Sequence, residues 1–344
     1  MEEFSEAVKN IFIINPHSGK KRRQKKLIGA VEAAAAKTGM HCEIYFTKAA
    51  GDGERYIREV CEASAEDGEK LRIYACGGDG TINEAVNGAF GYENVEIGAV
   101  PMGTGNDYIR NYGTAEEFLD IEGQLAGTSV CSDLIYYDAE YRGVHTVGYC
   151  ANMFNIGFDC NVVDMTSRVK KWPLAGGALA YLVSVAIILI EKKGADLTIC
   201  YSDGSRSEGK ILLTAVANGC YCGGGVKGVP YCELDDGFMD VSVVQNISRS
   251  FFVRLFPSYS KGTHMNKRAI QENQVIKYTK EKSLTITANG ESLRLCTDGE
   301  ITTQKKIEFK VVPGAFRFII PAKGRSENRT ENPDENRDEN SGLK

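Results

Sequence analysis

The sequence predicts a parallel-sheet α/β domain at the N-terminus, followed by an antiparallel β-sandwich domain. Residues 9–127 alternate short apolar strands with amphipathic helices, an order that is typical of a parallel sheet with crossover helices. In residues 128–311 strand-like runs dominate, which favours an antiparallel sandwich. The chain has 344 residues, of which 42% are hydrophobic, so it is long enough to bury two cores.

The first domain is expected to hold four strands and five helices. The strands fall near residues 11–14, 43–46, 71–76 and 95–100, and the helices near 22–37, 52–66, 81–89, 105–110 and 115–126. Within the first helix, Leu27, Val31 and Ala34 or Ala35 recur at the spacing of one apolar face. We therefore expect this helix to bury that face against the sheet.

The second domain is expected to consist mainly of strands. They fall near residues 132–137, 146–156, 196–201, 210–217, 239–245, 275–278, 284–288, 293–296, 301–303 and 307–312, with helical segments near 174–192 and 248–259. Asp203 and Gly204 form a hairpin turn between two of these strands. The segment 323–344 has no apolar residue except Leu343, so we expect it to be disordered.

Three glycine-containing corners join strands to helices at one edge of the predicted parallel sheet. The first corner consists of Asn15, Pro16, His17, Ser18 and Gly19, the second of Gly77, Gly78, Asp79, Gly80, Thr81, Ile82 and Asn83, and the third of Gly103, Thr104, Gly105, Asn106 and Asp107. Ligands of open α/β sheets bind outside the carboxyl ends of the strands, where these corners fall. One corner alone would be ordinary turn chemistry, but three in series predict a binding site.

The residue types in these corners indicate a ligand that carries phosphate groups. Glycines let backbone N–H groups approach a phosphate closely, and the start of the following helix adds unpaired donors and a partial positive charge. The corners contain neither the dinucleotide fingerprint G-x-G-x-x-G nor the GK[ST] ending of a P-loop. Asp79 cannot bind phosphate directly, so we expect it to orient a metal ion, a ribose hydroxyl or the loop itself.

The three blocks NP-x-SG, GGDGTINE and P-x-GTGND resemble the catalytic domain of diacylglycerol kinases, in particular the soluble bacterial branch of that lipid kinase family. The resemblance runs from about Lys9 to Pro321. GGDGT alone is shared with NAD kinases and, nearly, with phosphofructokinases, whereas the GTGND block and the later half of the chain favour lipid kinases. The resemblance also implies that the segment near 312–321 returns to the first domain.

The resemblance implies an enzyme that transfers the γ-phosphoryl group of ATP, bound with Mg²⁺, to a lipid hydroxyl. Diacylglycerol, which would give phosphatidic acid, is the first choice of acceptor. The implied ATP-binding residues lie in the three corners and at Thr47, although a threonine at the end of a strand is equally common as a structural residue. A sphingoid base, phosphatidylglycerol or NAD stays open as the acceptor. A further alternative is a nucleotide-binding regulator without catalysis, which would lack the residue that acts as the base.

Two acidic turns in the second half are the candidates for a base and a second cation. On the residues alone, Asp298-Gly299-Glu300 is a hairpin turn. The lipid kinases carry a similar DGE, which implies that Glu300 accepts the proton of the lipid hydroxyl. The other turn contains Glu233, Asp236 and Phe238, and the resemblance implies a structural Mg²⁺ held by the Asp236 carboxylate and by backbone oxygens of the other two.

Composition and charge restrict the partners of the protein. A net charge of −5 and a pI near 5.6 argue against nucleic acid. Eleven cysteines without a signal peptide or a metal-binding spacing indicate a reducing cytosol. We therefore expect a cytoplasmic enzyme that acts peripherally at the inner membrane face, and a homodimer stays open.

Two segments are candidates for contact with lipid. The basic run Lys20 to Lys26 is either a solvated helix face, an attractor of triphosphate or a contact for anionic headgroups. The uncharged run Leu174 to Ile190 is shorter than the about 20 apolar residues that a membrane-spanning helix needs. We expect a buried or lipid-facing helix there and no transmembrane span.

Overall fold

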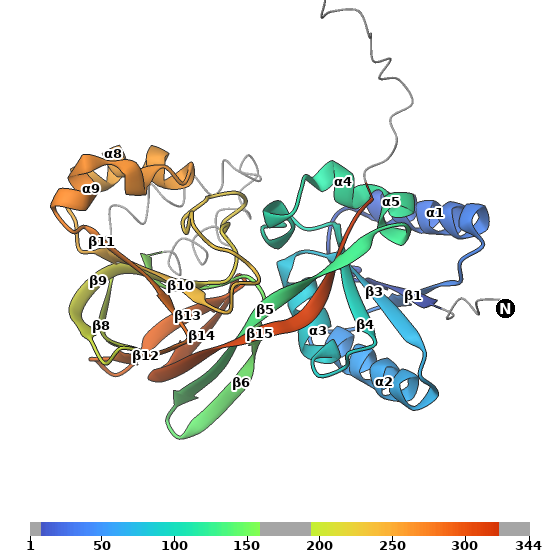
Figure 1. Ribbon diagram of the computed structural model, residues 1–344, viewed down its shortest axis with the longest axis horizontal. Helices are drawn as coiled ribbons and strands as arrows, with labels where there is room; N and C mark the ends of the chain where they lie inside the picture. Colours follow the sequence, from blue (N-terminus) through green and yellow to red (C-terminus); the bar gives the residue numbers. More distant parts are fainter. Residues whose placement is uncertain (1–7, 159–193, 323–344) are drawn as a thin grey trace, which may run out of the picture.

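The computed structural model describes residues 8–158 and 194–322. Figure 1 shows two lobes joined by two long strands, with the helices α1 to α5 in one lobe and α8 and α9 at the far end of the other. The expected helix near 174–192 and the expected disordered segment 323–344 lie outside the described residues. Among the helices of the described ranges, none combines the length and the apolarity that crossing a bilayer requires.

The first lobe is built on a parallel sheet, as the sequence predicts. Its strands are β1 (Val8–Ile14), β2 (Cys42–Phe46), β3 (Lys70–Gly77) and β4 (Val95–Pro101), and they lie in the order β2-β1-β3-β4. Every neighbouring pair among these four is parallel, so the carboxyl ends of the strands share one edge.

Helices cover both faces of this sheet. They are α1 (Lys21–Thr38), α2 (Asp52–Asp67), α3 (Asp79–Ala89), the 3-10 turn η1 (Tyr108–Asn111), α4 (Ala115–Leu119) and α5 (Ile121–Leu125). Along β1, Ile11 and Ile13 pack in the cluster of α2 and α3, whereas Phe12 and Ile14 pack in the cluster of α1 and α5. Successive strand residues thus alternate between two buried faces, which explains why β1 is apolar from Ile11 to Ile14.

Two expected helices of this lobe are shorter than predicted. The helix expected near 105–110 is the single turn η1, because Asn106 before it has a left-handed backbone (φ 51°) that a helix cannot include. The helix expected near 115–126 is split at Asp120, whose backbone is extended (φ −78°, ψ 101°).

The second lobe consists of antiparallel strands, again as predicted. They are β5 (Thr128–Tyr141), β6 (Val144–Cys150), β7 (Met153–Gly157), β8 (Ala195–Tyr201), β9 (Arg206–Ala217), β10 (Met239–Gln245), β11 (Ile276–Glu281), β12 (Ser283–Ala288), β13 (Leu293–Thr297), β14 (Glu300–Gln304) and β15 (Lys306–Ile320). The single strand expected near 146–156 is two strands, β6 and β7, separated at Ala151 and Asn152. The helices are α8 (Arg249–Ser260), η2 (His264–Asn266) and α9 (Arg268–Glu272).

The strands β5 and β15 connect the lobes (Figure 1). They pair antiparallel over most of their length, and the first part of β15 also pairs with β12 of the second lobe. Beyond a register irregularity after Val312, Arg317 and Phe318 pair in parallel with β4 of the first lobe. The sheet is therefore continuous across both lobes, and the domain limits at residues 127 and 311 stay a prediction.

Candidate active site

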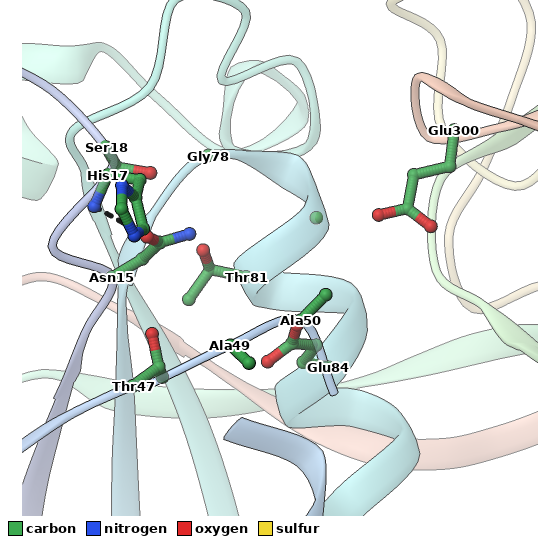
Figure 2. Close-up of a pocket in the computed structure, with 11 residues that line it drawn as sticks. Asn15, His17, Ser18, Thr47, Ala49, Ala50, Gly78, Thr81, Glu84 and Glu300 are labelled. Atoms are coloured by element: carbon green, nitrogen blue, oxygen red, sulfur yellow. Dashed lines mark hydrogen bonds between the residues drawn. The ribbon is translucent and has the colours of Figure 1, made fainter. Parts of the chain in front are cut away.

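A pocket of about 390 Å³ lies at the carboxyl edge of the parallel sheet. It is lined by Asn15, His17, Ser18, Thr47, Ala49, Ala50, Gly78, Gly80, Thr81, Glu84 and Glu300. Ten of these residues come from the first lobe, and Glu300, at the start of β14, comes from the second. Figure 2 shows the Glu300 carboxylate turned toward the other residues from across the pocket.

The structure brings together part of the predicted nucleotide site. Among the expected residues, those that line the pocket are Asn15, His17, Ser18, Thr47, Gly78, Gly80, Thr81 and Glu300. The lining does not include Pro16, Gly19, Gly77, Asp79, Ile82, Asn83 or Thr104. Direct contacts of this second group with the ligand stay a prediction, and several of its members have the supporting roles described below.

The first corner is a compact turn that α1 holds in place. The Asn15 side-chain oxygen accepts the N–H of His17 at 2.9 Å, and the Asn15 carbonyl accepts the N–H of Ser18 at 3.0 Å. From the first turns of α1, the Gln24 amide donates to the carbonyls of Pro16 at 2.7 Å and Ser18 at 3.1 Å. The position of the corner is thus fixed before any ligand arrives.

In the second corner, glycine is required for two different reasons. A Cβ on Gly77 would overlap the side chain of Thr81, so the strand can turn into α3 only without a side chain there. A Cβ on Gly80 would meet no atom of the protein within 4 Å. Gly80 therefore leaves open space at the start of α3, where the partial positive charge of the helix lies.

The partly buried Asp79 ties the second corner to the third. Its carboxylate accepts the backbone N–H of Asp107 at 2.7 Å and of Tyr108 at 3.1 Å. Asp107 in turn accepts the N–H of Gly224, in the second lobe, at 2.9 Å. Burial raises the pKa of Asp79 above its usual range, and burial together with the charge of Asp79 raises the pKa of Asp107 to about 6. Of the three roles expected for Asp79, these bonds favour that of holding the loop.

Glu84, which the sequence analysis left without a role, shapes the wall opposite the corners. Its two carboxylate oxygens accept the N–H groups of Gly51 at 3.0 Å and Gly53 at 3.1 Å, around the start of α2. This contact from α3 holds the segment with Ala49 and Ala50 against the pocket. Gly51 and Gly53 at a helix start were the available signal, but their partner lies about 30 residues further along the chain.

The turn that carries Glu300 is held from both lobes. Asp298 and Gly299 have φ of 46° and 96°, as a two-residue hairpin turn between β13 and β14 requires. The Asp298 carboxylate accepts the N–H of Met153 at 3.2 Å, and burial and then the charge of Asp79 raise its pKa to about 7. Glu300 itself is exposed in the pocket.

The turn expected to hold a structural Mg²⁺ is paired with a lysine side chain from β11. The Lys280 ammonium binds the Asp236 carboxylate and lies 3.7 Å from a Glu233 carboxylate oxygen, while the other Asp236 oxygen accepts the Phe238 N–H at 3.0 Å. Within the described ranges, no three His, Cys, Asp or Glu side chains are grouped so that they could hold a metal ion. As arranged, the Asp236 carboxylate is paired with an ammonium, and the structural Mg²⁺ site, which would use backbone oxygens of Glu233 and Phe238, stays a prediction.

Two family comparisons cover most of the chain. Residues 9–134 match the diacylglycerol kinase catalytic domain, and residues 152–320 match the YegS C-terminal NAD kinase beta sandwich-like domain. The boundary between the two matches falls within the strands β5 to β7 that lead from one lobe to the other.

Individual proteins show the same similarity over nearly their whole length. The chain is 31% identical over 300 residues to a protein of Staphylococcus carnosus named diacylglycerol kinase, covering 86% of this chain and 90% of that one. It is 28% identical over 295 residues to a Bacillus subtilis protein of the same name, covering 84% and 88%. A crystal structure of a diacylglycerol kinase from Bacillus anthracis has the same fold, with a TM-score of 0.62 at 22% identity over 91% of this chain and 96% of that one.

Proposed function

Because this chain belongs to the diacylglycerol kinase family, the ATP-dependent lipid kinases, we propose that it transfers the γ-phosphoryl group of ATP to the hydroxyl of diacylglycerol and so forms phosphatidic acid. The observation that carries this proposal is one pocket in which the Glu300 carboxylate, supplied by the second lobe, faces the glycine-containing corners of the parallel sheet. The names of the relatives support diacylglycerol as the acceptor.

The corner side of the pocket would hold the triphosphate of ATP. The start of α3 offers the partial positive charge of a helix N-terminus next to Gly78 and Gly80, where no side chain fills the space. The basic residues at the start of α1 add positive charge beside the first corner. The Mg²⁺ of the reaction arrives with ATP as part of the substrate and offsets the charge of the phosphates.

Glu300 would act as the general base. Its carboxylate takes the proton of the lipid hydroxyl as the new O–P bond forms, and the bond between the γ-phosphorus and the bridging oxygen of ADP breaks. Position supports this role, because Glu300 is the one residue of the pocket lining that the second lobe supplies. Asp79, which does not line the pocket, would act indirectly by holding the second and third corners together.

A water-insoluble acceptor requires the enzyme to work at a lipid surface. We infer a cytoplasmic protein that docks reversibly on the inner face of the membrane. The basic run Lys20 to Lys26 lies beside the first corner and is the candidate contact among the described residues. The other candidate, the apolar run Leu174 to Ile190, lies outside the described residues.

The test is transfer of radiolabel from ATP to a panel of acceptors. Diacylglycerol, a sphingoid base and phosphatidylglycerol would each be presented in mixed micelles, and NAD would be supplied in solution. We expect label in phosphatidic acid. Label in another acceptor alone would indicate a kinase with a different substrate. Binding of ATP without transfer to any acceptor would indicate a nucleotide-binding regulator.

A further inference from the structure

Asp298 lies where the turn that carries Glu300 meets both lobes. One oxygen of its carboxylate accepts the N–H of Met153, at the start of β7, at 3.2 Å. The other oxygen lies 3.3 Å from the Cys150 sulfur and 3.5 Å from the Asn83 amide nitrogen, both of which can donate to it. Asn83 belongs to α3, one turn after Gly80, so this single side chain reaches from the base-bearing turn to the phosphate-binding helix.

The backbone of Asp298 is fixed by the same neighbour as its side chain. Its N–H donates to the carbonyl of Met153 at 3.3 Å, while its carboxylate accepts the N–H of that residue. Asp298 also adopts a left-handed backbone, which is strained for a residue with a side chain. A residue with this conformation and a partly buried carboxylate persists where its neighbours compensate for both costs. We therefore expect the turn to lose its position when the carboxylate is removed.

The attachment of the lobes to each other does not depend on Asp298. The Asn87 amide donates to the carbonyl of Tyr149 at 2.9 Å, and its oxygen accepts the Tyr149 N–H at 2.9 Å. The rings of Phe90 and Tyr149 stack at 3.8 Å. These contacts hold α3 against β6, so loss of Asp298 should disturb the turn and leave the phosphate-binding helix in place.

We propose that Asp298 is a positioning residue, which holds Glu300 in register with the phosphate-binding helix by bonding to Met153 and Asn83. The proposal rests on the proposed function of Glu300 as the base. Ionisable groups that face Asp298 are Asp79, Cys150, Tyr108 and Tyr137, and of these the Cys150 sulfur, a weak acceptor, also lies within reach of the Met153 N–H. A shift of about 1 Å between base and acceptor can reduce turnover by about 100-fold, so the turn does not have to unfold to lose activity.

The experiment compares Asp298→Ala and Asp298→Asn with a matched control. Asp203 occupies another Asp-Gly hairpin, between β8 and β9, where it is exposed and bonds the N–H and the side chain of Ser205, both within the same turn. We expect kcat to fall about 10-fold or more in both Asp298 variants, with KM for ATP and thermal protection by ATP retained, and no change in Asp203→Ala. Hydrogen exchange of the amides of residues 298–301 should become faster.

Two results would overturn the proposal. One is a variant Asp298→Ala with turnover and amide exchange of the parent. The other is a loss of kcat accompanied by an equal loss of ATP protection, which marks a general structural role. Where Asp298→Ala does not fold, Asp298→Asn decides, because it keeps an acceptor for the Met153 N–H and alters the contacts with Asn83 and Cys150. Hydrogen exchange needs no lipid, so a wrong assignment of the acceptor or of the base would leave that readout intact.

Discussion

Replacing Gly80 with valine should abolish ATP binding and leave the fold intact. Gly80 lines the pocket at the start of α3, and a Cβ placed there meets no protein atom within 4 Å. The larger side chain would fill the space in which the phosphates approach the backbone donors. Valine also has a helix propensity a few tenths of a kcal/mol better than glycine, so the unliganded variant should be as stable as the parent.

The magnitude follows from ligand linkage. ATP at 100 times its Kd stabilises the parent by about 2.7 kcal/mol. A 100-fold weaker affinity reduces that stabilisation to about 0.4 kcal/mol at the same concentration. Thermal melting with and without ATP and Mg²⁺ measures this difference directly, because the protection should nearly disappear in Gly80→Val.

A second glycine provides the control. Gly29 on α1 also has no atom within 4 Å of an added Cβ, and it lies outside the pocket lining. Gly29→Val should keep full protection by ATP. If ATP protects Gly80→Val as strongly as the parent, the second corner is not the phosphate site. If the unliganded variant already melts much earlier than the parent, the inference of open space at Gly80 is wrong.

Three further predictions concern the base, the pairing of Asp236 with Lys280 and acid stability. Glu300→Gln keeps the size of the side chain and removes its basicity, so kcat should fall by roughly 100-fold or more with ATP protection unchanged; near-parental turnover would contradict the assignment. Without nucleotide, the melting temperature of the parent should be the same in excess Mg²⁺ and in chelator. Lys280→Met frees the Asp236 carboxylate, so its melting temperature should rise with Mg²⁺. A parent whose melting temperature already rises with Mg²⁺ would support the structural metal site. Burial lowers the pKa of His264 to about 4, whereas the same side chain in the unfolded state has a pKa near 6.5. The unfolded state therefore binds the extra proton first, and the protein loses stability as pH falls from about 6.5 to 4. Urea unfolding should show a loss of about 3 kcal/mol at pH 4 that His264→Phe removes, and equal pH dependence in both proteins would refute it.

The helices and strands of the first lobe could be predicted from the sequence because their signals are local. The strand residues Ile11 to Ile14 are apolar without interruption, which identifies a strand buried on both faces, and the glycine corners are contiguous in the chain. The short elements were harder. A helix was expected near 105–110 because the residues around Tyr108 are compatible with one, and only the left-handed backbone of Asn106 ends that pattern.

The contacts that complete the site were not readable in the same way. Asn83 and Asp298 are 215 positions apart, and Asp107 and Gly224 are 117 apart. Neither pair has a local sequence spacing from which the contact could be predicted. The sequence around Asp236 indicates a cation site because it shows the carboxylate of the turn. It does not show the partner Lys280, which β11 supplies from 44 positions away. Polar pairing over such separations is decided by the topology of the sheet.

Hydrogen bonds of two carboxylates, those of Asp107 and Asp298, cross between the lobes at separate places, and they fix how the site is assembled. Asp107 of the third corner accepts the N–H of Gly224, and Asp298 of the base-bearing turn is within reach of the Asn83 amide. A carboxylate partly removed from water is stabilised by each donor around it, so opening the pocket widely would cost each of these side chains one of its donors. The continuous pairing of β5 with β15 further opposes separation of the lobes. The distance between Glu300 and the glycine-containing corners is therefore set mainly by the fold. This is the arrangement expected where catalysis depends on positioning more than on covalent chemistry by the protein.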